Sequence, residues 1–461
     1  MNNAQSEENS NAVLFVICMA AFLVPFSSSA LNLALPMINR DLSLNAAASG
    51  WVPTVYLLST AIFQIPFARI ADIFGRRKIF MLGIAIFTAF SVMSGFATHG
   101  AELIVYRFFC GIGSAMVFST NMALLTASVP PRKRGWALGI NTAVVYFSLS
   151  AGPFLGGILT QYIGWESIFF ITALVSAIVY LSSFKFLKKD KENKKIPFDY
   201  VGASLYAFGL FALIYGFSGL TKLLNFILVF IGILILYVMV LYEKRQDKPV
   251  FDVILFMKNR IFTYSSFSAL INYSATTSIV FLMSFYFQEV RGLTPRDAGL
   301  ILIISSLVQA VVSLQSGRLS DKVPASKLAT LGMLIISIGL ILLCFIGETT
   351  SYISILLILI LIGAGFGTFS SPNMNVIMSS VEKKDYGLAS ATTGTMRLTG
   401  QAFSMGIAMM AISFTVGNVQ ITKAVQHEFM AGMRICFIVC SALCLLGVYA
   451  SSIRNKKGEK N

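Results

Sequence analysis

Long apolar runs alternate with short polar segments along the whole chain. Each run has about 20 residues, which as a helix crosses the ~30 Å hydrocarbon core of a bilayer. The runs are continuous, whereas the strands of an outer-membrane barrel alternate over about 10 residues, so the pattern predicts helices and excludes a barrel. We expect fourteen membrane-spanning helices, at residues 12–36, 48–70, 78–97, 101–126, 135–162, 166–186, 198–219, 223–242, 261–288, 297–317, 326–346, 351–378, 386–415 and 431–453.

The composition is that of a protein that crosses a membrane many times. Of the 461 residues, 56% are hydrophobic and 12% are charged, whereas a soluble protein has about 25% charged residues. The net charge is +15, and with both termini inside, 27 Lys and Arg fall on the inner side, five in outer loops and three within spans. The positive-inside rule therefore predicts an inner-membrane protein with cytoplasmic termini. The cations serve topology and contact with membrane lipids, and we expect no binding to nucleic acid.

Two charged linkers, at 185–197 and 243–260, divide the apolar runs into groups. Six runs precede the first linker, two lie between the linkers and six follow the second. The second linker has an amphipathic centre at Phe251–Met257, which favours a helix along the membrane surface. We predict an N-terminal six-helix bundle at 1–186, linkers with two additional transmembrane helices at 187–260, a C-terminal six-helix bundle at 261–453 and a cytoplasmic tail at 454–461.

The two groups of six carry an internal repeat. The segments GIGSAMVFSTN, from Gly111, and GAGFGTFSSPN, from Gly363, align at an offset of 252 residues. The same offset aligns Gly135-Trp-Ala with Gly387-Leu-Ala. Chance identity among small residues is the alternative. Two related halves are typical of transporters that bind a substrate at the interface between repeats.

The turn at 68–78, ARIADIFGRRK, is unusually polar for its place between two spans. Gly75 provides the backbone freedom of a tight turn, and the cations from Arg76 onward hold the turn on the cytoplasmic side. Asp72 is not explained by topology, because an acid is stabilised by a helix N-terminus rather than by the helix end that it occupies. A weaker copy of this turn occurs at 317–322.

The fifth run contains the segment SLSAGPFLGG at 148–157. Gly152 and Pro153 interrupt the helical hydrogen-bond ladder, and Gly156 and Gly157 allow another backbone to approach closely. A simple packing seam of small residues would need the same pattern, so the segment alone does not establish a conformational role.

Three polar residues lie inside spans and are candidates for a transport pathway. Arg107 is about 9 Å from the outer end of its helix and Arg397 about 16 Å from the inner end of its own. An Arg at a helix centre costs ~2.5–3.5 kcal/mol on insertion scales and usually faces a cavity. Snorkelling to the headgroups is the alternative for Arg107 but is difficult for Arg397. Asn32, within LNLALP, could form hydrogen bonds in the same cavity.

Together these motifs resemble those of major facilitator superfamily transporters, in particular the fourteen-helix drug:proton antiporter branch. The turn at 68–78 is similar to the family's loop between the second and third helices, although Ala68 and Ile73 replace a usual Gly and Arg. The segment at 148–157 resembles the fifth-helix antiporter motif, with Ser148 in place of its first Gly. The stretches around Asn32, Arg107 and Arg397 resemble first-, fourth- and penultimate-helix motifs of the same branch.

The resemblance implies an all-α major facilitator fold, with two six-helix bundles and two extra central helices that alternate in access. It implies gating roles for Asp72, Gly75 and Arg76, with Asp72 contacting the helix that starts near 386–387 in the opposite half. It implies that the fifth-helix segment is a hinge and an inner seal, associated with export.

The charges within the spans bear on substrate and coupling. No Asp or Glu lies near a span centre, whereas Arg107 and Arg397 make the expected cavity positive. We therefore expect a neutral or anionic amphiphile as substrate, and H⁺ as the coupling ion although its binding site is not evident. A metabolite or lipid-like anion carrier is an alternative. A non-transporting sensor is disfavoured because no sizeable soluble domain is present.

The sequence gives no reason to expect an enzyme. We find no Walker-type nucleotide loop and no Ser-His-acid or His/acid metal arrangement. We expect no cofactor, no metal and no catalytic residue, and a monomeric protein.

Overall fold

The computed structural model describes residues 2–130, 134–187, 190, 198–218, 223–246, 250–251, 253–320, 322–382 and 386–458. These residues are largely helical and include no strand. The helices are α1 (Asn2–Asp41), α2 (Ala46–Phe74), α3 (Arg76–Gly95), α4 (Gly100–Ser128), α5 (Arg134–Tyr162), α6 (Glu166–Phe186), α7 (Tyr200–Phe217), α8 (Leu223–Glu243), α9 (Val253–Lys258), α10 (Arg260–Thr276), α11 (Ser278–Phe285), η2 (Tyr286–Val290), α12 (Pro295–Leu319), α13 (Ala325–Leu343), α14 (Tyr352–Ser379), α15 (Tyr386–Thr415), η4 (Lys423–Val425) and α16 (Gln426–Gly458).

Fourteen segments within the described residues are long and apolar enough to cross a membrane, as the sequence predicts. The predicted span at 261–288 is not one uniform helix. It is built from α10, α11 and the π-helical turn η2, which together run from Arg260 to Val290. The short helix α9 occupies the amphipathic centre of the second linker.

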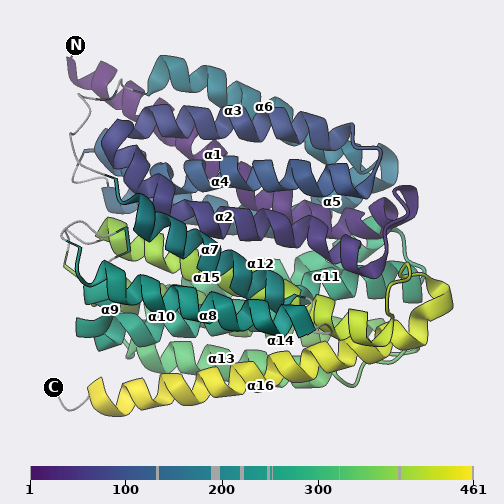
Figure 1. Cartoon of the computed structure of the whole chain (residues 1–461). Helices are drawn as coiled ribbons and strands as arrows, with labels where there is room; N and C mark the ends of the chain where they lie inside the picture. The colour runs from purple at the N-terminus through teal and green to yellow at the C-terminus, as the bar shows by residue number, and fades with distance from the viewer. Residues whose placement is uncertain are drawn as a thin grey trace.

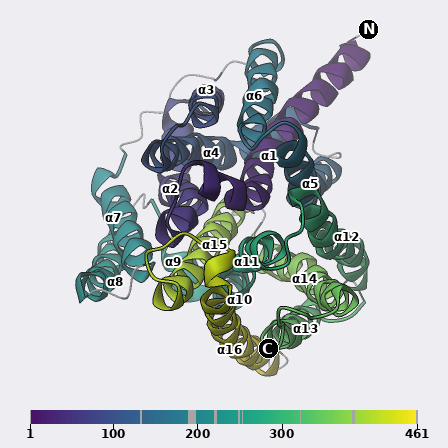
Figure 2. The same ribbon diagram turned by 90° about the vertical axis from the view of Figure 1, so that its right-hand side faces the viewer.

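The long helices run side by side and both chain termini lie at one end of the bundle (Figure 1). We call this the terminal end and the opposite end the remote end. Seen along the helices, α1 to α6 form one group and α10 to α16 form another (Figure 2). The predicted all-α architecture, with two six-helix groups and an extra helix pair, is confirmed.

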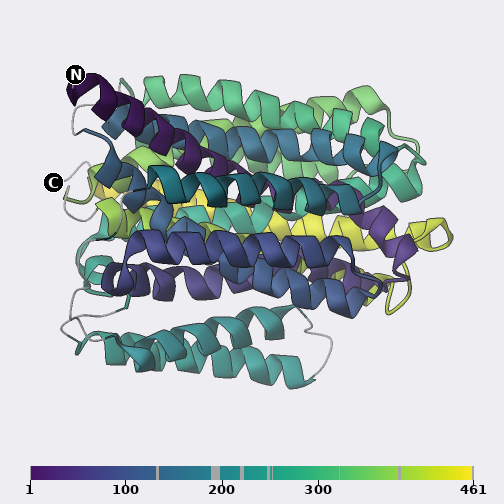
Figure 3. The same ribbon diagram turned by 90° about the horizontal axis from the view of Figure 1, so that it is seen from above.

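The extra pair, α7 and α8, lies at the edge of the molecule (Figure 3). The Tyr206 hydroxyl of α7 donates to the carbonyl of Ala61 in α2, 3.0 Å away. At the other end of α7, the Phe217 ring lies 5.4 Å from the Phe403 ring of α15. The pair therefore contacts both halves, and most of α8 is left facing outward.

The internal repeat is visible in how equivalent residues pack. A Cβ on Gly113 would lie 2.6 Å from the carbonyl oxygen of Gly83, so only glycine lets α4 pack this closely on α3. Gly365, 252 residues later, has the same relation between α14 and α13: a Cβ there would lie 2.9 Å from the carbonyl oxygen of Gly332.

Two repeated asparagines make equivalent hydrogen bonds. The Asn121 amide of α4 donates to the carbonyl of Ile17 in α1, and the Asn373 amide of α14 donates to the carbonyl of Ser265 in α10. Each half thus ties its fourth span to its first span by the same contact, which supports the repeat over chance identity.

Candidate functional site

Arg397 lies between the two halves. It is half-buried on α15, and its guanidinium carbon lies 5.6 Å from the centre of the Phe118 ring on α4. Among the described residues, no hydrogen-bond acceptor or acidic partner contacts this guanidinium. The sequence predicted the depth of Arg397, and the structure adds that the side chain faces the opposite half.

Arg397 and four aromatic residues from four further helices form a continuous set of neighbours. Tyr273 of α10 has Arg397 and Tyr146 of α5 among its polar neighbours. The Tyr273 ring also lies 5.4 Å from the Phe366 ring of α14, at 71°. With Phe118 these residues form what we call the Arg397 cluster, whose five members are all half-buried.

The members of the Arg397 cluster lie at similar depths. Counted along their helices from the terminal end, all five are between about 15 and 20 Å deep at 1.5 Å per residue. Because α4 and α5 belong to one half and α10, α14 and α15 to the other, the cluster marks a mid-depth level at which the two halves meet. Sequence reasoning missed Phe118 and Phe366, since nothing in their spacing relates them to Arg397.

Arg107 has a different environment from Arg397. It is fully buried, and its NH1 donates to the Ser27 hydroxyl at 3.0 Å. Its guanidinium carbon stacks 4.1 Å from the centre of the Tyr56 ring, while Nε and NH2 have no hydrogen-bond partner. Ser27 and Tyr56 belong to α1 and α2, so Arg107 lies inside the N-terminal half and does not snorkel to the surface.

Several amides on the N-terminal half have buried, unpartnered oxygens, and Asn32 and Gln64 are two of them. Asn32 is half-buried on α1, and its Oδ1 accepts no hydrogen bond. Gln64 of α2 is buried with an unpartnered Oε1, next to Gly394 of α15. A Cβ on Gly394 would lie 2.8 Å from the Gln64 Nε2, so α2 and α15 approach closely one turn from Arg397.

The predicted gating turn is held within its own half. Gly75 has a φ of +112°, which only glycine adopts readily. The Asp72 carboxylate pairs with the Arg76 guanidinium at 2.8 Å, and both side chains are exposed. The predicted contact of Asp72 with the start of α15 stays a prediction, because the side chains at 386–388 lie outside the described residues, as does Asp321 in the second copy of the turn.

An unpredicted acid holds this turn from the first linker. Asp190 accepts hydrogen bonds from the backbone N–H groups of Arg77 at 3.0 Å and Lys78 at 3.1 Å. Its carboxylate thereby caps the N-terminus of α3, where the helix dipole favours negative charge. A Cβ on Gly75 would lie 2.3 Å from the Asp190 Oδ2. The sequence signal was an acid within a lysine-rich run, together with a helix, α3, that begins without a capping side chain.

The glycines of α5 allow close backbone contacts on two sides. Gly152 and Gly156 pack against Ser29 and Ala30 of α1. Gly157 faces α12 of the other half, where a Cβ would lie 2.5 Å from the Pro295 carbonyl oxygen.

The close approach of α5 to α12, which we call the α5–α12 seam, has a second contact at Pro153 of α5. Its carbonyl oxygen lies 2.6 Å from where a Cβ on Gly299 of α12 would be. The seam between α5 and α12 therefore lies toward the remote end. On the predicted orientation this is the outer side, whereas the family resemblance implied an inner seal.

Polar contacts join the two halves at the remote end. Arg40, at the end of α1, pairs with the Glu289 carboxylate of η2 at 2.9 Å. Glu289 is buried while the Arg40 side chain is 61% exposed. Further bonds between the halves run from Gln288 to the Leu33 carbonyl, from the Ala46 N–H to the Val419 carbonyl and from Arg296 to the Tyr162 hydroxyl. We call these contacts the remote seal.

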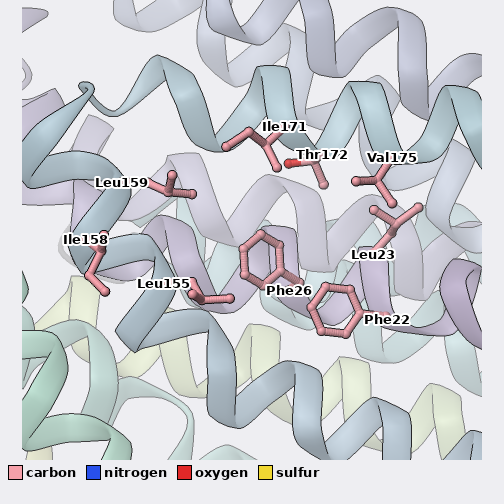
Figure 4. Close-up of a pocket in the computed structure, with 9 residues that line it drawn as sticks. All are labelled: Phe22, Leu23, Phe26, Leu155, Ile158, Leu159, Ile171, Thr172 and Val175. Atoms are coloured by element: carbon pink, nitrogen blue, oxygen red, sulfur yellow. The ribbon is translucent and has the colours of Figure 1, made fainter.

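A separate apolar pocket of about 250 Å³ lies among α1, α5 and α6 of the N-terminal half (Figure 4). Phe22 and Phe26 line one side, Ile171 and Val175 lie across from them, and the Thr172 hydroxyl is the polar group among the labelled residues. Since no charged residue lines it, this pocket offers no counter-charge to an ion. Elsewhere in the described residues, no group of three or more His, Cys, Asp or Glu could hold a metal ion.

The family profile of the Major Facilitator Superfamily matches residues 17–405 and 266–457. The riboflavin transporter RibZ of Clostridioides difficile is 28% identical over 459 residues, which cover 97% of this chain and 98% of RibZ. The multidrug resistance protein Stp of Mycobacterium tuberculosis is 28% identical over 400 residues, covering 86% of this chain and 73% of Stp.

The fold is also found among solved structures. A bacterial homologue of the human lysosomal transporter Spinster, in an inward-facing and occupied conformation, superposes with a TM-score of 0.69 over 96% of each chain at 16% identity. At this identity the similarity concerns the fold alone. With the profile match over almost the whole length and the fourteen spans, it leads to one conclusion: the chain belongs to the Major Facilitator Superfamily of membrane transporters.

Proposed function

We propose that this protein is a proton-coupled secondary transporter that exports neutral or anionic amphiphiles by alternating access. The observation that carries the proposal is the unpartnered Arg397 guanidinium between the two halves. An unpaired cation at mid-depth in a membrane protein is costly and is retained where it faces a substrate or ion pathway. A substrate with a negative or electron-rich group supplies the acceptor that Arg397 lacks.

Alternating access is supported by the repeat and by the remote seal. Two related halves can rock about a site at their interface and open it to each side in turn. In this conformation the remote seal closes one end, so the Arg397 cluster would be reached from the terminal end. With cytoplasmic termini, this is the state that loads a substrate for export. Similarity to the multidrug resistance protein Stp also favours export.

For coupling we propose Glu289 as the proton-binding group. Among the described acids it is the one buried between the two halves. Protonation would remove the negative charge that holds Arg40, which weakens the remote seal from its outer side. Proton binding would in this way favour the outward-open state.

A second candidate function is the transport of a metabolite. The observation that favours it is the similarity to a riboflavin transporter over nearly the full length of both chains. The two candidates share the same site and differ in the substrate.

The test is flux in liposomes with an imposed pH gradient, measured for anionic, neutral and cationic amphiphiles. Gradient-driven flux of anionic and neutral compounds that Arg397→Ala abolishes is the expected result. Arg434→Ala is the matched control, since Arg434 is exposed on α16 and donates to the Cys344 carbonyl within the C-terminal half. Equal flux of lipophilic cations, or unchanged flux in Arg397→Ala, contradicts the proposal.

Coupling is tested with Glu289→Gln in the same liposomes. Gradient-driven flux should be lost, while exchange of substrate across the membrane without a gradient should remain. Gradient-driven flux equal to that of the unaltered protein would remove Glu289 as the proton-binding group.

A further inference from the structure

We infer that the Arg397 cluster selects substrates that combine a planar aromatic ring system with a negative charge. This inference names the substrate class of the proposed transport site and rests on that function for its role, although it can be tested by binding alone.

The aromatic preference follows from how much ring surface gathers at one depth. Phe118, Tyr146, Tyr273 and Phe366 come from four helices and are all half-buried. An aliphatic pathway would be lined by Leu, Ile or Val. Aromatic side chains instead favour flat partners in offset-stacked or edge-to-face arrangements. The edge-to-face contact of Tyr273 with Phe366 leaves ring surface of both residues accessible.

The preference for negative charge follows from Arg397. Its guanidinium is planar and has five N–H donors, which suits carboxylates and other oxyanions and also stacks on rings. It already lies over the Phe118 ring, and no described acceptor occupies its donors. An aromatic anion can use both properties at once, with its ring beside Phe118 and its acid group on the guanidinium.

Two features should make the site discriminate against planar cations and alkyl chains. No described carboxylate pairs with Arg397, so a planar cation would meet an uncompensated positive charge. The tyrosine hydroxyls of Tyr146 and Tyr273 lie near each other, on either side of the boundary between the halves. They can donate to acceptors on the ring system, which an alkyl chain lacks.

The apolar pocket beside Phe22 and Phe26 provides an internal contrast. It lies within one half and has no charged residue. It can take an alkyl chain but has no means to select a charged ring. Charge and ring selection should therefore depend on the Arg397 cluster alone.

The experiment measures equilibrium binding to the full-length protein in lipid nanodiscs, by calorimetry. Four probes separate the two properties: 2-naphthalenesulfonate, uncharged 2-naphthol, aliphatic 1-octanesulfonate and cationic N-methylquinolinium. We expect 2-naphthalenesulfonate to bind at least tenfold more tightly than each of the others. Equal affinity for 1-octanesulfonate would overturn the ring requirement, and equal affinity for N-methylquinolinium would overturn the charge requirement.

Variants assign the preference to the cluster. Arg397→Gln should lower the affinity for the sulfonates about tenfold or more and change that for 2-naphthol little. Tyr273→Phe should preserve the preference for a ring, while Tyr273→Leu should remove most of it. The matched controls are Arg434→Gln and Tyr215→Leu, since Tyr215 stacks on Phe211 within α7. Equal losses in the controls would overturn the assignment.

Misfolding and failure of the proposed function can be told apart from failure of this inference. A variant whose thermal midpoint falls is replaced by the milder Arg397→Lys, which keeps the charge but loses the planar fork and should still weaken sulfonate binding. Selective binding without gradient-driven flux would contradict the transport proposal and leave the aromatic site standing. Gradient-driven flux without selectivity among the four probes would contradict the aromatic site and leave the transport proposal standing.

Discussion

The two ends of the bundle differ in which contacts hold them. At the remote end, side chains and backbone groups of one half bond directly to the other, with the Arg40–Glu289 ion pair at 2.9 Å among them. At the terminal end, the described contacts of Asp72 and Asp190 stay within the N-terminal half and its linker. Asp72 pairs with Arg76, and Asp190 caps α3. One conformation thus has an end where the halves bond directly to each other and an end where the described contacts of Asp72 and Asp190 lie within one half and its linker.

This difference shows how a transporter can be closed and still able to open. The remote seal consists of several contacts, most of which have one exposed partner. An exposed ion pair contributes only about 0.2–1 kcal/mol, so no single contact would hold the end shut. The close backbone approach of α5 to α12 adds shape complementarity, which a rocking motion can separate as a unit.

Gly157→Leu should reduce the difference between the two ends most strongly, because it should open the remote end. A side chain there meets the Pro295 carbonyl, which a Cβ would already approach to 2.5 Å. Overpacking costs up to about 3 kcal/mol, which lowers the ratio of closed to open remote ends about 100-fold. We expect loss of flux and rapid labelling of a cysteine introduced at Leu33 by a membrane-impermeant maleimide. Gly139→Ala, on the same helix with no atom within 4 Å, is the control; a normal labelling rate in Gly157→Leu would contradict the account.

Gly75→Ala alters the gating turn at the terminal end. An alanine at a φ of +112° is strained by about 1–3 kcal/mol, and its Cβ would also displace Asp190. We expect a several-fold lower rate of flux with little change in labelling at Leu33. Gly292→Ala, at a φ of +66° with open space around it, carries strain without that contact. The account predicts a smaller defect for Gly292→Ala, and an equal one would count against a role for the Asp190 contact.

Glu289→Gln should weaken the remote seal moderately. Removing an ion pair whose Arg partner is mostly exposed costs about 1 kcal/mol, so labelling at Leu33 should rise about fivefold. A labelling rate equal to that of the unaltered protein would show that the Arg40–Glu289 pair does not contribute to the remote seal.

Asp190→Ala should have the smallest effect. Loss of a cap at a helix N-terminus costs about 1 kcal/mol, which corresponds to about 2 °C in the thermal midpoint. Asp190→Asn keeps an acceptor for the N–H groups of Arg77 and Lys78 and should lose less. If the two variants lost stability equally, the negative charge rather than the hydrogen bonds would be the important property.

Much of the fold could be predicted from the sequence, because membrane spans are set by the length of continuous apolar runs. The break in the span that begins at Arg260 could not. There the N–H of Ser278 donates to the Ser404 hydroxyl of α15, a partner 126 residues away. Such a contact satisfies the backbone at an interruption that the local sequence does not announce.

The depth of the site residues in the membrane could be predicted from the sequence, but the direction in which their side chains point could not. Position along a helix places Arg107 and Arg397 at their distances from the membrane surfaces. Rotation about the helix axis decides what each contacts, and this depends on packing. Arg107 consequently lies against Tyr56 inside one half, while Arg397 lies against Phe118 across the boundary between the halves.

The most direct test of alternating access is a reversible cross-link across the remote seal. Arg40→Cys and Glu289→Cys, combined in a background without reactive native cysteines, should cross-link efficiently with a short bifunctional reagent. As a control within the N-terminal half, Asp41→Cys with Trp165→Cys replaces a contact of 2.9 Å. Because Glu289→Cys lacks the proposed proton-binding group, the readout is exchange of substrate without a gradient. The account predicts that the cross-link between halves abolishes this exchange, that its cleavage restores it and that the control cross-link leaves it unchanged. Normal exchange with the two halves joined at Arg40 and Glu289 would contradict it.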